Sequence, residues 1–263
     1  MSVRRLLILP ALAAAAIAPV PARAGATFTA TTRVEGPARR LAGIGGSTVR
    51  GWVDAERGKI EFVESDNPAT PKGDVLLTTD GGKTLRYFDL ERKECRPWTP
   101  PAARETRIGP GSPVSTSFRN VRVEKVLDDA GPVIAGLSTR HCRVKSEYDT
   151  LLQGQGSSRR AHTVTIDDLW VAEELRDPAF SVWLTKGSPG AAGGELGAKL
   201  DAVLTGVPGA PVRRVTSTTV AFDGGRPATT TTRTEVTGLH RETIPPPAFD
   251  PPLDCTKRTG HER

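Results

Sequence analysis

One short stretch decides the fold prediction: residues 75–90 read VLLTTDGGKTLRYFDL. Two apolar, β-branched and aromatic runs, residues 75–79 and 84–90, flank the segment DGGK at residues 80–83. Asp-Gly supplies the positive φ that a tight turn between antiparallel strands requires. The stretch therefore predicts a β-hairpin, and the rest of the chain is best read outward from it.

The same alternation of short strands and turns continues on both sides of this hairpin. Towards the N-terminus, residues 48–54 and 59–65 predict a second hairpin around the turn at residues 55–58. Towards the C-terminus, residues 91–93 turn the chain into a further short strand at residues 94–98. Together these segments predict an antiparallel meander.

Further strand patterns and two short helical patterns follow a loop or lid at residues 99–113, which is rich in Pro and Gly. A short helix is expected at residues 177–186, where Pro178 suits a first turn. A second is expected at residues 195–204, where leucines and a valine form one stripe. The later predicted strands are residues 115–127, 133–148, 161–171, 212–222 and 228–238.

The tally is about ten strands, with two short helices and no regular alternation of strand and helix. An antiparallel sheet of that length usually curls into a barrel or half-barrel. We therefore expect a mainly β protein: a curled antiparallel sheet, with one or two short helices covering its concave side. The expected domain is residues 25–249, and a Pro-rich, basic C-terminal tail follows at residues 250–263.

The first 24 residues have the pattern of a secretory signal peptide. Arg4 and Arg5 form a basic head, residues 6–20 are apolar but too short to span a membrane, and ARA at residues 22–24 offers small residues for cleavage. We expect cleavage after Ala24. The mature protein is then periplasmic or secreted, and no transmembrane segment remains in it.

The charge of the chain disfavours nucleic acid as a partner. The formal net charge is +6, and the leader carries three arginines and no acid, so removing it leaves 6 − 3 = +3. The basic pairs at residues 39–40, 159–160 and 213–214 are scattered. Phosphate-driven binding needs a concentrated basic face, which this pattern does not predict.

Three cysteines occur: Cys95, Cys142 and Cys255. In an oxidising compartment this number suggests one disulfide and one leftover thiol. All three pairings are compatible with the sequence. A pair that uses Cys255 is favoured, because the Pro-rich tail otherwise has little to anchor it.

No pattern of catalytic or metal-binding residues stands out, and we predict no catalytic residue, metal or cofactor. His141 and Cys142 are adjacent, as are Asp167 and Asp168, and neighbours on a strand point to opposite faces. Neither a zinc spacing nor a G-x-S-x-G sequence is present. A hydrolase would require His141 or His162 within hydrogen-bond reach of both a carboxylate and a nucleophile.

Apolar side chains on the predicted strands either form the core or line an apolar cavity. Aromatic residues make up only 5% of the chain, which argues against a sugar-binding cleft built from stacked rings. The candidate ligand-lining residues are Trp52, Ile60, Phe62, Leu76, Leu85, Tyr87 and Trp170.

Several segments between residues 47 and 249 carry a family resemblance. They are residues 51–54 (GWVD), 60–62 (IEF), 65–68 (SDNP), 71–73 (PKG), 77–84 (LTTDGGKT), 134–137 (IAGL), 139–144 (TRHCRV) and 168–171 (DLWV). In these segments the chain resembles a bacterial family of exported proteins of unknown function. That family is similar in strand layout to the LolA/LolB and LppX group of lipoprotein and lipid carriers. The resemblance implies a half-barrel whose helices cover an apolar concavity, and it implies no catalytic residues.

Two functions from different classes follow. The first is a periplasmic or secreted, non-enzymatic protein that binds an apolar ligand, a lipid or a lipoprotein acyl chain, inside the curled sheet. Affinity would come from about 0.8 kcal/mol per buried CH₂ group. The alternative is a cell-envelope interaction or sensor module that uses the same fold without lipid and binds an envelope protein. A deep apolar cavity favours the first, and a filled core with an exposed apolar patch favours the second.

Overall fold

The computed structural model describes residues 25–37, 45–68, 70–98, 115–154, 157–180 and 194–255. The expected leader, the predicted loop at residues 99–113 and the last eight residues of the tail, 256–263, lie outside these ranges. The strands are β1 (Gly25–Glu35), β2 (Ser47–Asp54), β3 (Arg57–Ser65), β4 (Val75–Thr78), β5 (Arg86–Asp89), β6 (Glu94–Pro97), β7 (Ser115–Ala130), β8 (Arg140–Gly154), β9 (Ser157–Ala172), β10 (Ala210–Phe222) and β11 (Ala228–Glu242).

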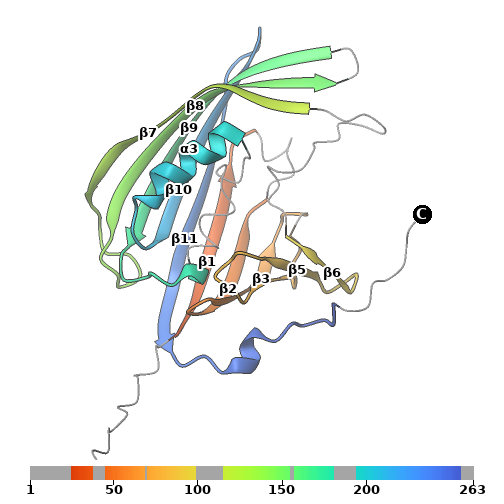
Figure 1. Ribbon diagram of the computed structural model, residues 1–263, viewed down its shortest axis with the longest axis vertical. Helices are drawn as coiled ribbons and strands as arrows, with labels where there is room; N and C mark the ends of the chain where they lie inside the picture. Colours follow the sequence, from red (N-terminus) through yellow and green to blue (C-terminus); the bar gives the residue numbers. More distant parts are fainter. Residues whose placement is uncertain are drawn as a thin grey trace, which may run out of the picture.

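All of these strands belong to one sheet, in the order β6-β5-β4-β3-β2-β1-β11-β10-β9-β8-β7. Every pairing in it is antiparallel. Figure 1 shows that the sheet curls strongly, so that it has a concave face and an outer face. The predicted class, a curled antiparallel sheet with few helices, is confirmed.

The meander predicted from residues 48–98 is confirmed as β2 to β6, each strand pairing with the next. At the turn after β4, Gly81 and Gly82 have φ of 67° and 81°. The Asp80 carboxylate accepts hydrogen bonds from the backbone N–H and the hydroxyl of Thr84, at 2.9 Å and 2.6 Å. These bonds hold the pKa of Asp80 down at about 2. The turn chemistry that decided the prediction therefore operates in the fold.

Two strand predictions need correction. Residues 133–139 are not strand but part of the connection between β7 and β8, where Ile134 and Leu137 exchange backbone hydrogen bonds of 3.0 Å and 2.9 Å. Pro132 lacks an N–H, and Ala135 and Gly136 adopt positive φ, so a tight turn replaces the strand. The strand β1 was not predicted at all. It pairs with both β11 and β2, so it joins the meander, β2 to β6, to the half formed by the long strands β7 to β11.

The helix predicted at residues 195–204 is confirmed as α3 (Gly194–Thr205). Leu196 and Leu200 of this helix are buried, and Figure 1 shows α3 lying across the concave side of the sheet. Of the helix predicted at residues 177–186, residues 178–180 are helical, Asp177 precedes the helix, and residues 181–186 lie outside the described residues. A 3-10 helix, η3 (Pro246–Phe249), follows β11.

Directly paired residues share a face of a sheet, so the register traces one face from strand to strand. Leu169 on β9 pairs with Arg214 on β10, Arg214 with Thr234 on β11, and Thr234 with Thr32 on β1. Thr32 lies on the same face of β1 as Phe28, four residues earlier. Because α3 packs on Leu169, this is the concave face throughout.

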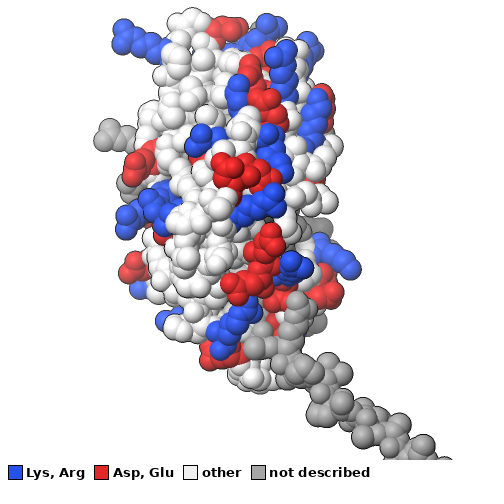
Figure 2. Space-filling model, turned by 90° about the vertical axis from the view of Figure 1, so that its left-hand side faces the viewer, with Lys and Arg blue, Asp and Glu red and all other residues white. Residues whose placement is uncertain are grey.

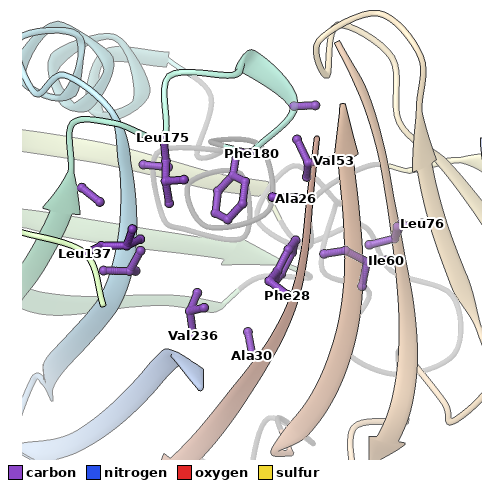
Figure 3. Packing of buried hydrophobic residues seen from close by; sticks show 14 of the residues in the cluster. Ala26, Phe28, Ala30, Val53, Ile60, Leu76, Leu137, Leu175, Phe180 and Val236 are labelled. Carbon is purple, nitrogen blue, oxygen red and sulfur yellow. The ribbon is translucent and has the colours of Figure 1, made fainter. Parts of the chain in front are cut away.

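Two apolar clusters lie on the concave face. The Phe28 cluster covers β1 to β5 and extends over the ends of β9 to β11, where it includes Ala172, Ala210, Val212 and Val236. The ring of Phe28 packs against that of Phe180 with centroids 5.0 Å apart (Figure 3). The α3 cluster covers β7 to β9, where Leu196 and Leu200 are buried in one cluster with Val144 and Leu169.

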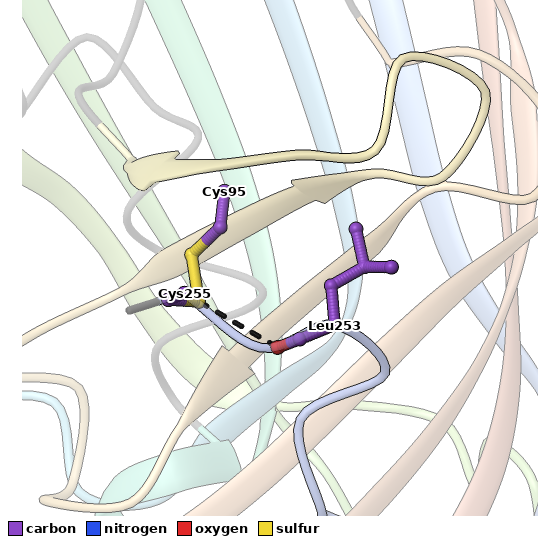
Figure 4. Close-up of a disulfide and its surroundings, with 3 residues drawn as sticks. All are labelled: Cys95, Leu253 and Cys255. Atoms are coloured by element: carbon purple, nitrogen blue, oxygen red, sulfur yellow. Dashed lines mark hydrogen bonds between the residues drawn. A yellow bond between two sulfur atoms is a disulfide. The ribbon is translucent and has the colours of Figure 1, made fainter. Parts of the chain in front are cut away.

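A third cluster, the outer cluster, lies on the opposite face of the meander. Val75, Leu77 and Phe88 are covered there by Ile244 and Phe249 from the chain after β11. A disulfide between Cys95 on β6 and Cys255 fastens the end of this covering segment to the sheet (Figure 4). The predicted use of Cys255 is confirmed. Residues 250–255 are therefore part of the folded unit rather than a free tail.

Candidate functional site on the concave face

Between the Phe28 cluster and the α3 cluster, the concave face carries polar side chains, which we call the polar band. The register brings its members together, since Thr165 pairs with Thr218 and Asp167 with Thr216. Thr163, Thr165, Asp167 and Ser146 are buried. The band consists of Thr32 (β1), Ser146 (β8), Thr163, Thr165 and Asp167 (β9), Arg214, Thr216 and Thr218 (β10) and Thr234 (β11).

An ion pair lies in the polar band. Arg214 donates from Nε and Nη2 to Oδ1 of Asp167, at 3.0 Å and 2.8 Å. Its Nε also lies 3.1 Å from the hydroxyl of Thr216, which in turn donates to the same carboxylate oxygen. The two charged side chains are only 11% and 9% exposed. Two charged side chains can be buried to that extent because each neutralises the other.

Hydroxyl pairs extend the band on both sides of the ion pair. Thr165 and Thr218 lie 3.2 Å apart between their Oγ1 atoms, and Thr32 and Thr234 lie 3.0 Å apart. A hydroxyl has one donor hydrogen and two acceptor lone pairs, so each such pair uses one of its two hydrogens. The hydroxyl of Tyr148 also hydrogen-bonds Thr165, and burial raises the pKa of that tyrosine. The band thus retains hydrogen-bonding capacity on an otherwise apolar face.

Four of the seven predicted ligand-lining residues lie together on the concave face. Ile60, Phe62, Leu76 and Tyr87 all belong to the Phe28 cluster and are buried there by one another and by their neighbours. The Tyr87 hydroxyl donates to the buried carboxylate of Asp74. Burial raises the pKa of Asp74.

The other three predicted lining residues are not members of the Phe28 cluster, although Trp170 packs against it. Leu85 is half-buried in the connection between β4 and β5. Trp52 alternates with Val53 along β2, so it points to the outer face and packs against the outer cluster. Trp170 pairs with Arg213 and His141 on the outer face of β10 and β8. Trp52 therefore does not share a surface with the concave residues, whereas Trp170 also packs against the Phe28 cluster.

The outer face of β8 to β10 carries a stack of paired side chains. The His141 ring lies parallel to that of Trp170 with centroids 4.4 Å apart, and the guanidinium of Arg213 lies 5.4 Å from the same indole. Nε2 of His141 is 2.7 Å from Asp168, which also accepts from Arg143. The predicted opposite orientations of His141 and Cys142, and of Asp167 and Asp168, are confirmed.

The histidines identified as hydrolase candidates each reach a carboxylate. His162 lies with Nδ1 3.0 Å from Asp149, and this contact lowers the pKa of that carboxyl. Across the described ranges, neither His141 nor His162 hydrogen-bonds a serine, threonine or cysteine. Cys142 lies beneath α3, 3.3 Å from Asp128. Burial raises the pKa of this thiol to about 11, which opposes formation of the reactive thiolate.

A hollow of about 340 Å³ lies at the end of β1 to β3, away from both concave clusters. It borders the polar band at Thr32, and its other lining residues are Thr31, Gly46, Ser47, Thr48, Glu64, Ser65 and Asp66. The apolar residues of the concave face are, by contrast, packed against protein side chains. The sequence led us to expect an apolar hollow, and the concave face instead alternates apolar clusters with the polar band.

The surface seen in Figure 2 carries basic and acidic side chains next to one another, without a large area of either sign. Where the structure describes the chain, no group of three His, Cys, Asp or Glu side chains is placed to hold a metal ion. No helix within the described ranges is long and apolar enough to cross a membrane. The chain matches no known family model, and no curated protein matches it.

The polar band was not predicted from the sequence. A signal for it exists, because Thr163, Thr165 and Asp167 alternate with larger or apolar residues on β9, and Arg214, Thr216 and Thr218 do so on β10. The threonine runs were interpreted only as a preference for strand. Recognising the band requires the register between β9 and β10, which separated segments of sequence do not reveal.

Proposed function

We propose that this chain is an exported, non-enzymatic protein that holds an amphiphile, a lipid or a lipoprotein acyl chain, against the concave face of its sheet. One observation carries the proposal: on a single concave face, a buried polar band lies between two apolar clusters. An acyl chain gains about 0.8 kcal/mol per buried CH₂ on apolar surface. A polar head group gains hydrogen bonds from the hydroxyls of the band.

The acyl chain would lie where α3 now packs. The Phe28 cluster is closed by Phe180 and Leu175, and the backbone N–H of Ala179 lies 3.4 Å from the carbonyl of Ala55. The cover over β7 to β9 is slighter, because Leu196 and Leu200 alone of the α3 residues in the cluster are fully buried. We infer that α3 moves aside and that ligand CH₂ groups replace its leucines on the sheet.

Two observations support export. The leader pattern at residues 1–24 directs secretion. The disulfide between Cys95 and Cys255 suits an oxidising compartment, because cytosolic thiols are kept reduced. We propose a periplasmic or secreted location, and a relation to the LolA/LolB and LppX carriers at the level of the fold.

Lipid extraction and native mass spectrometry test the proposal. The full chain is purified from the periplasmic fraction without detergent, and we expect a lipid to be retained at about one molecule per chain. A pyrene-labelled acylglycerol then measures uptake by the delipidated protein. Leu200→Asn, which weakens the seat of α3, should increase the rate of uptake several-fold. Leu90→Asn, at a leucine that is 37% exposed on the meander, serves as the control and should leave it unchanged. No retained lipid and no uptake would exclude the carrier function.

A second candidate is an envelope docking module, and one observation favours it: the apolar concave clusters are already filled by the chain's own side chains. Its test is capture of a specific envelope protein by the purified full chain, compared with a truncation after Cys255. Removal of the whole segment from Ile244 is unsuitable, because it would uncover Phe88 and leave Cys95 unpaired. A partner captured by the full chain and lost on truncation would favour docking over lipid binding.

A further inference from the structure

We propose that the polar band selects the head group of the amphiphile: a neutral head with ester and hydroxyl groups, as in an acylglycerol, rather than a carboxylate or phosphate. This inference rests on the proposed function and adds the chemical class of the ligand. It is carried by the charge balance and the hydrogen-bonding groups of the band.

The band offers no uncompensated positive charge to an anion. Both Nε and Nη2 of Arg214 donate to Asp167, so the pair is neutral as a unit. Other cations at the edges of the α3 cluster are also paired. Lys199 lies 2.8 Å from Glu195, and both Arg140 and Lys125 contact Asp128. Arg140 also lies 4.0 Å from Glu173. Across these four cations and four carboxylates, an incoming anion therefore meets as much negative charge as positive.

Because the polar band is buried, this charge balance favours a neutral head group over an anionic one. Thr165 and Asp167 are 1% and 6% exposed, so a head group that reaches them loses most of its water. A buried anion without a compensating cation carries a large desolvation cost. It would also approach the carboxylate of Asp167. A neutral ester or hydroxyl incurs a much smaller cost and recovers it through hydrogen bonds.

The hydroxyl pairs suit such a head. In the Thr32–Thr234 pair, one hydroxyl hydrogen is used between the two side chains and one is left for an acceptor such as an ester carbonyl. The lone pairs of the same oxygens accept from a ligand hydroxyl. Thr165 and Thr218 continue this surface on β9 and β10, towards the α3 cluster where the acyl chain would lie.

Three ligands with the same acyl chain and different heads test the inference. Delipidated full chain is offered monooleoylglycerol, oleate and oleoyl lysophosphatidate in competition, at a pH where both acids are ionised, and bound species are counted by native mass spectrometry. We expect the acylglycerol to be preferred by about tenfold or more over either anion. Equal binding, or a preference for an anion, overturns the inference while leaving the carrier function standing. Binding of none of the three overturns both.

Two adjacent carboxylates on opposite faces supply the matched variants. Asp167→Asn removes the negative charge that balances Arg214, and should shift the preference towards oleate by about tenfold. Asp168→Asn, which changes the outer pair with His141 and Arg143, should leave the preference as in the wild type. An unchanged preference in Asp167→Asn, in protein shown by circular dichroism to be folded, contradicts the proposal.

A second pair of variants removes no charge, so it tests the proposal even if Asp167→Asn fails to fold. Thr218→Val deletes a hydroxyl of the band, whereas Thr219→Val deletes its neighbour, which pairs with Thr229 on the outer face. We expect Thr218→Val to weaken acylglycerol binding several-fold and Thr219→Val to have no effect. Equal effects of the two variants would contradict a role for the concave hydroxyls.

Discussion

The two halves of the sheet bury their strands in different ways. In the meander, all four residues of β4 are buried, and its two faces contact the Phe28 cluster and the outer cluster. In the half formed by the long strands β7 to β11, β9 buries alternate residues. Thr163 and Thr165 are concave and buried, whereas Ile166, between Thr165 and Asp167, is 36% exposed. One half is covered on both faces and the other mainly on its concave face.

This difference separates the proposed functions of the two halves. Residues covered on both faces, such as Leu76 and Phe88, are fixed by packing and have no surface left for a ligand. In the half that carries α3, this helix covers β7 to β9, and the polar band lies beside it. The meander therefore supplies stability, and the long-stranded half supplies the proposed binding surface.

The largest expected effect concerns the meander. Phe88 is fully buried in the outer cluster, and Phe88→Ala should lower the free energy of unfolding by about 3–5 kcal/mol, through lost transfer energy and the cavity left behind. Phe222, at the end of β10, is 47% exposed, and Phe222→Ala should cost less than about 1 kcal/mol. Urea denaturation measures both. Similar costs for the two phenylalanines would contradict the proposed division.

The second prediction concerns the disulfide that fastens the cover of the outer cluster. Replacing both Cys95 and Cys255 by Ser should cost about 2–4 kcal/mol, because the bond constrains an unfolded loop with a sequence separation of 160 residues. The variant should also bind a dye for exposed apolar surface, since Phe249 and Leu253 would lose their fastening. Cys142→Ala, at the free thiol, should leave dye binding unchanged. Dye binding by Cys142→Ala, without dye binding by the Cys95 and Cys255 double variant, would contradict the role of this disulfide in holding the cover of the outer cluster in place.

A smaller effect is expected for α3. Leu200→Ala should cost about 2 kcal/mol, at the low end for a buried leucine, because the neighbouring Val203 and Leu204 are half-buried and can relax. Hydrogen exchange should show faster opening of residues 194–205 with little change in β4 and β5. Equal acceleration in the meander would show that the two halves do not open separately.

The smallest effect is on pH dependence. The hydrogen bond from Arg213 lowers the pKa of Glu235 below its ordinary value of 4.5. The unfolded state then binds the proton more readily, so this pair stabilises the fold above pH 4.5, and its contribution is lost as the pH falls through the folded pKa. The groups are partly exposed, so we expect at most about 1 kcal/mol. Glu235→Gln should flatten the acid side of the stability profile, and an unchanged profile would contradict this.

Much of the fold could be predicted from the sequence, because local chemistry specified it. Asp80 and its glycines located one hairpin, and the leucine spacing on α3 located a helix. The strand β1 was missed because its buried positions include Ala26 and Ala30, which give little contrast with the threonines between them. The strand prediction began at residue 133 because Val133 and Ile134 are β-branched, but positive φ at Ala135 and Gly136 makes a tight turn there and β8 begins only at Arg140.

The candidate site was less predictable, because it depends on which strands become neighbours. Alternation correctly placed His141 opposite Cys142 and Asp167 opposite Asp168. It could not say which of these faces is concave, and so Trp52 was expected beside Ile60 although it points outward. Arg214 meets Asp167 across 47 residues of sequence, through the pairing of β9 with β10. Nothing local to either residue indicates that partner.

Photolabelling resolved to single residues tests the central claim most directly. An acylglycerol with a diazirine on its acyl chain is bound to the full chain, irradiated, and mapped by peptide fragmentation. On β9 the concave and outer residues alternate, so a single peptide reports the face. We predict label on Leu169 and on α3-cluster residues such as Val144, and none on Ile166 or Val164. Label on Ile166 and Val164, with Leu169 unlabelled, would contradict binding at the concave face.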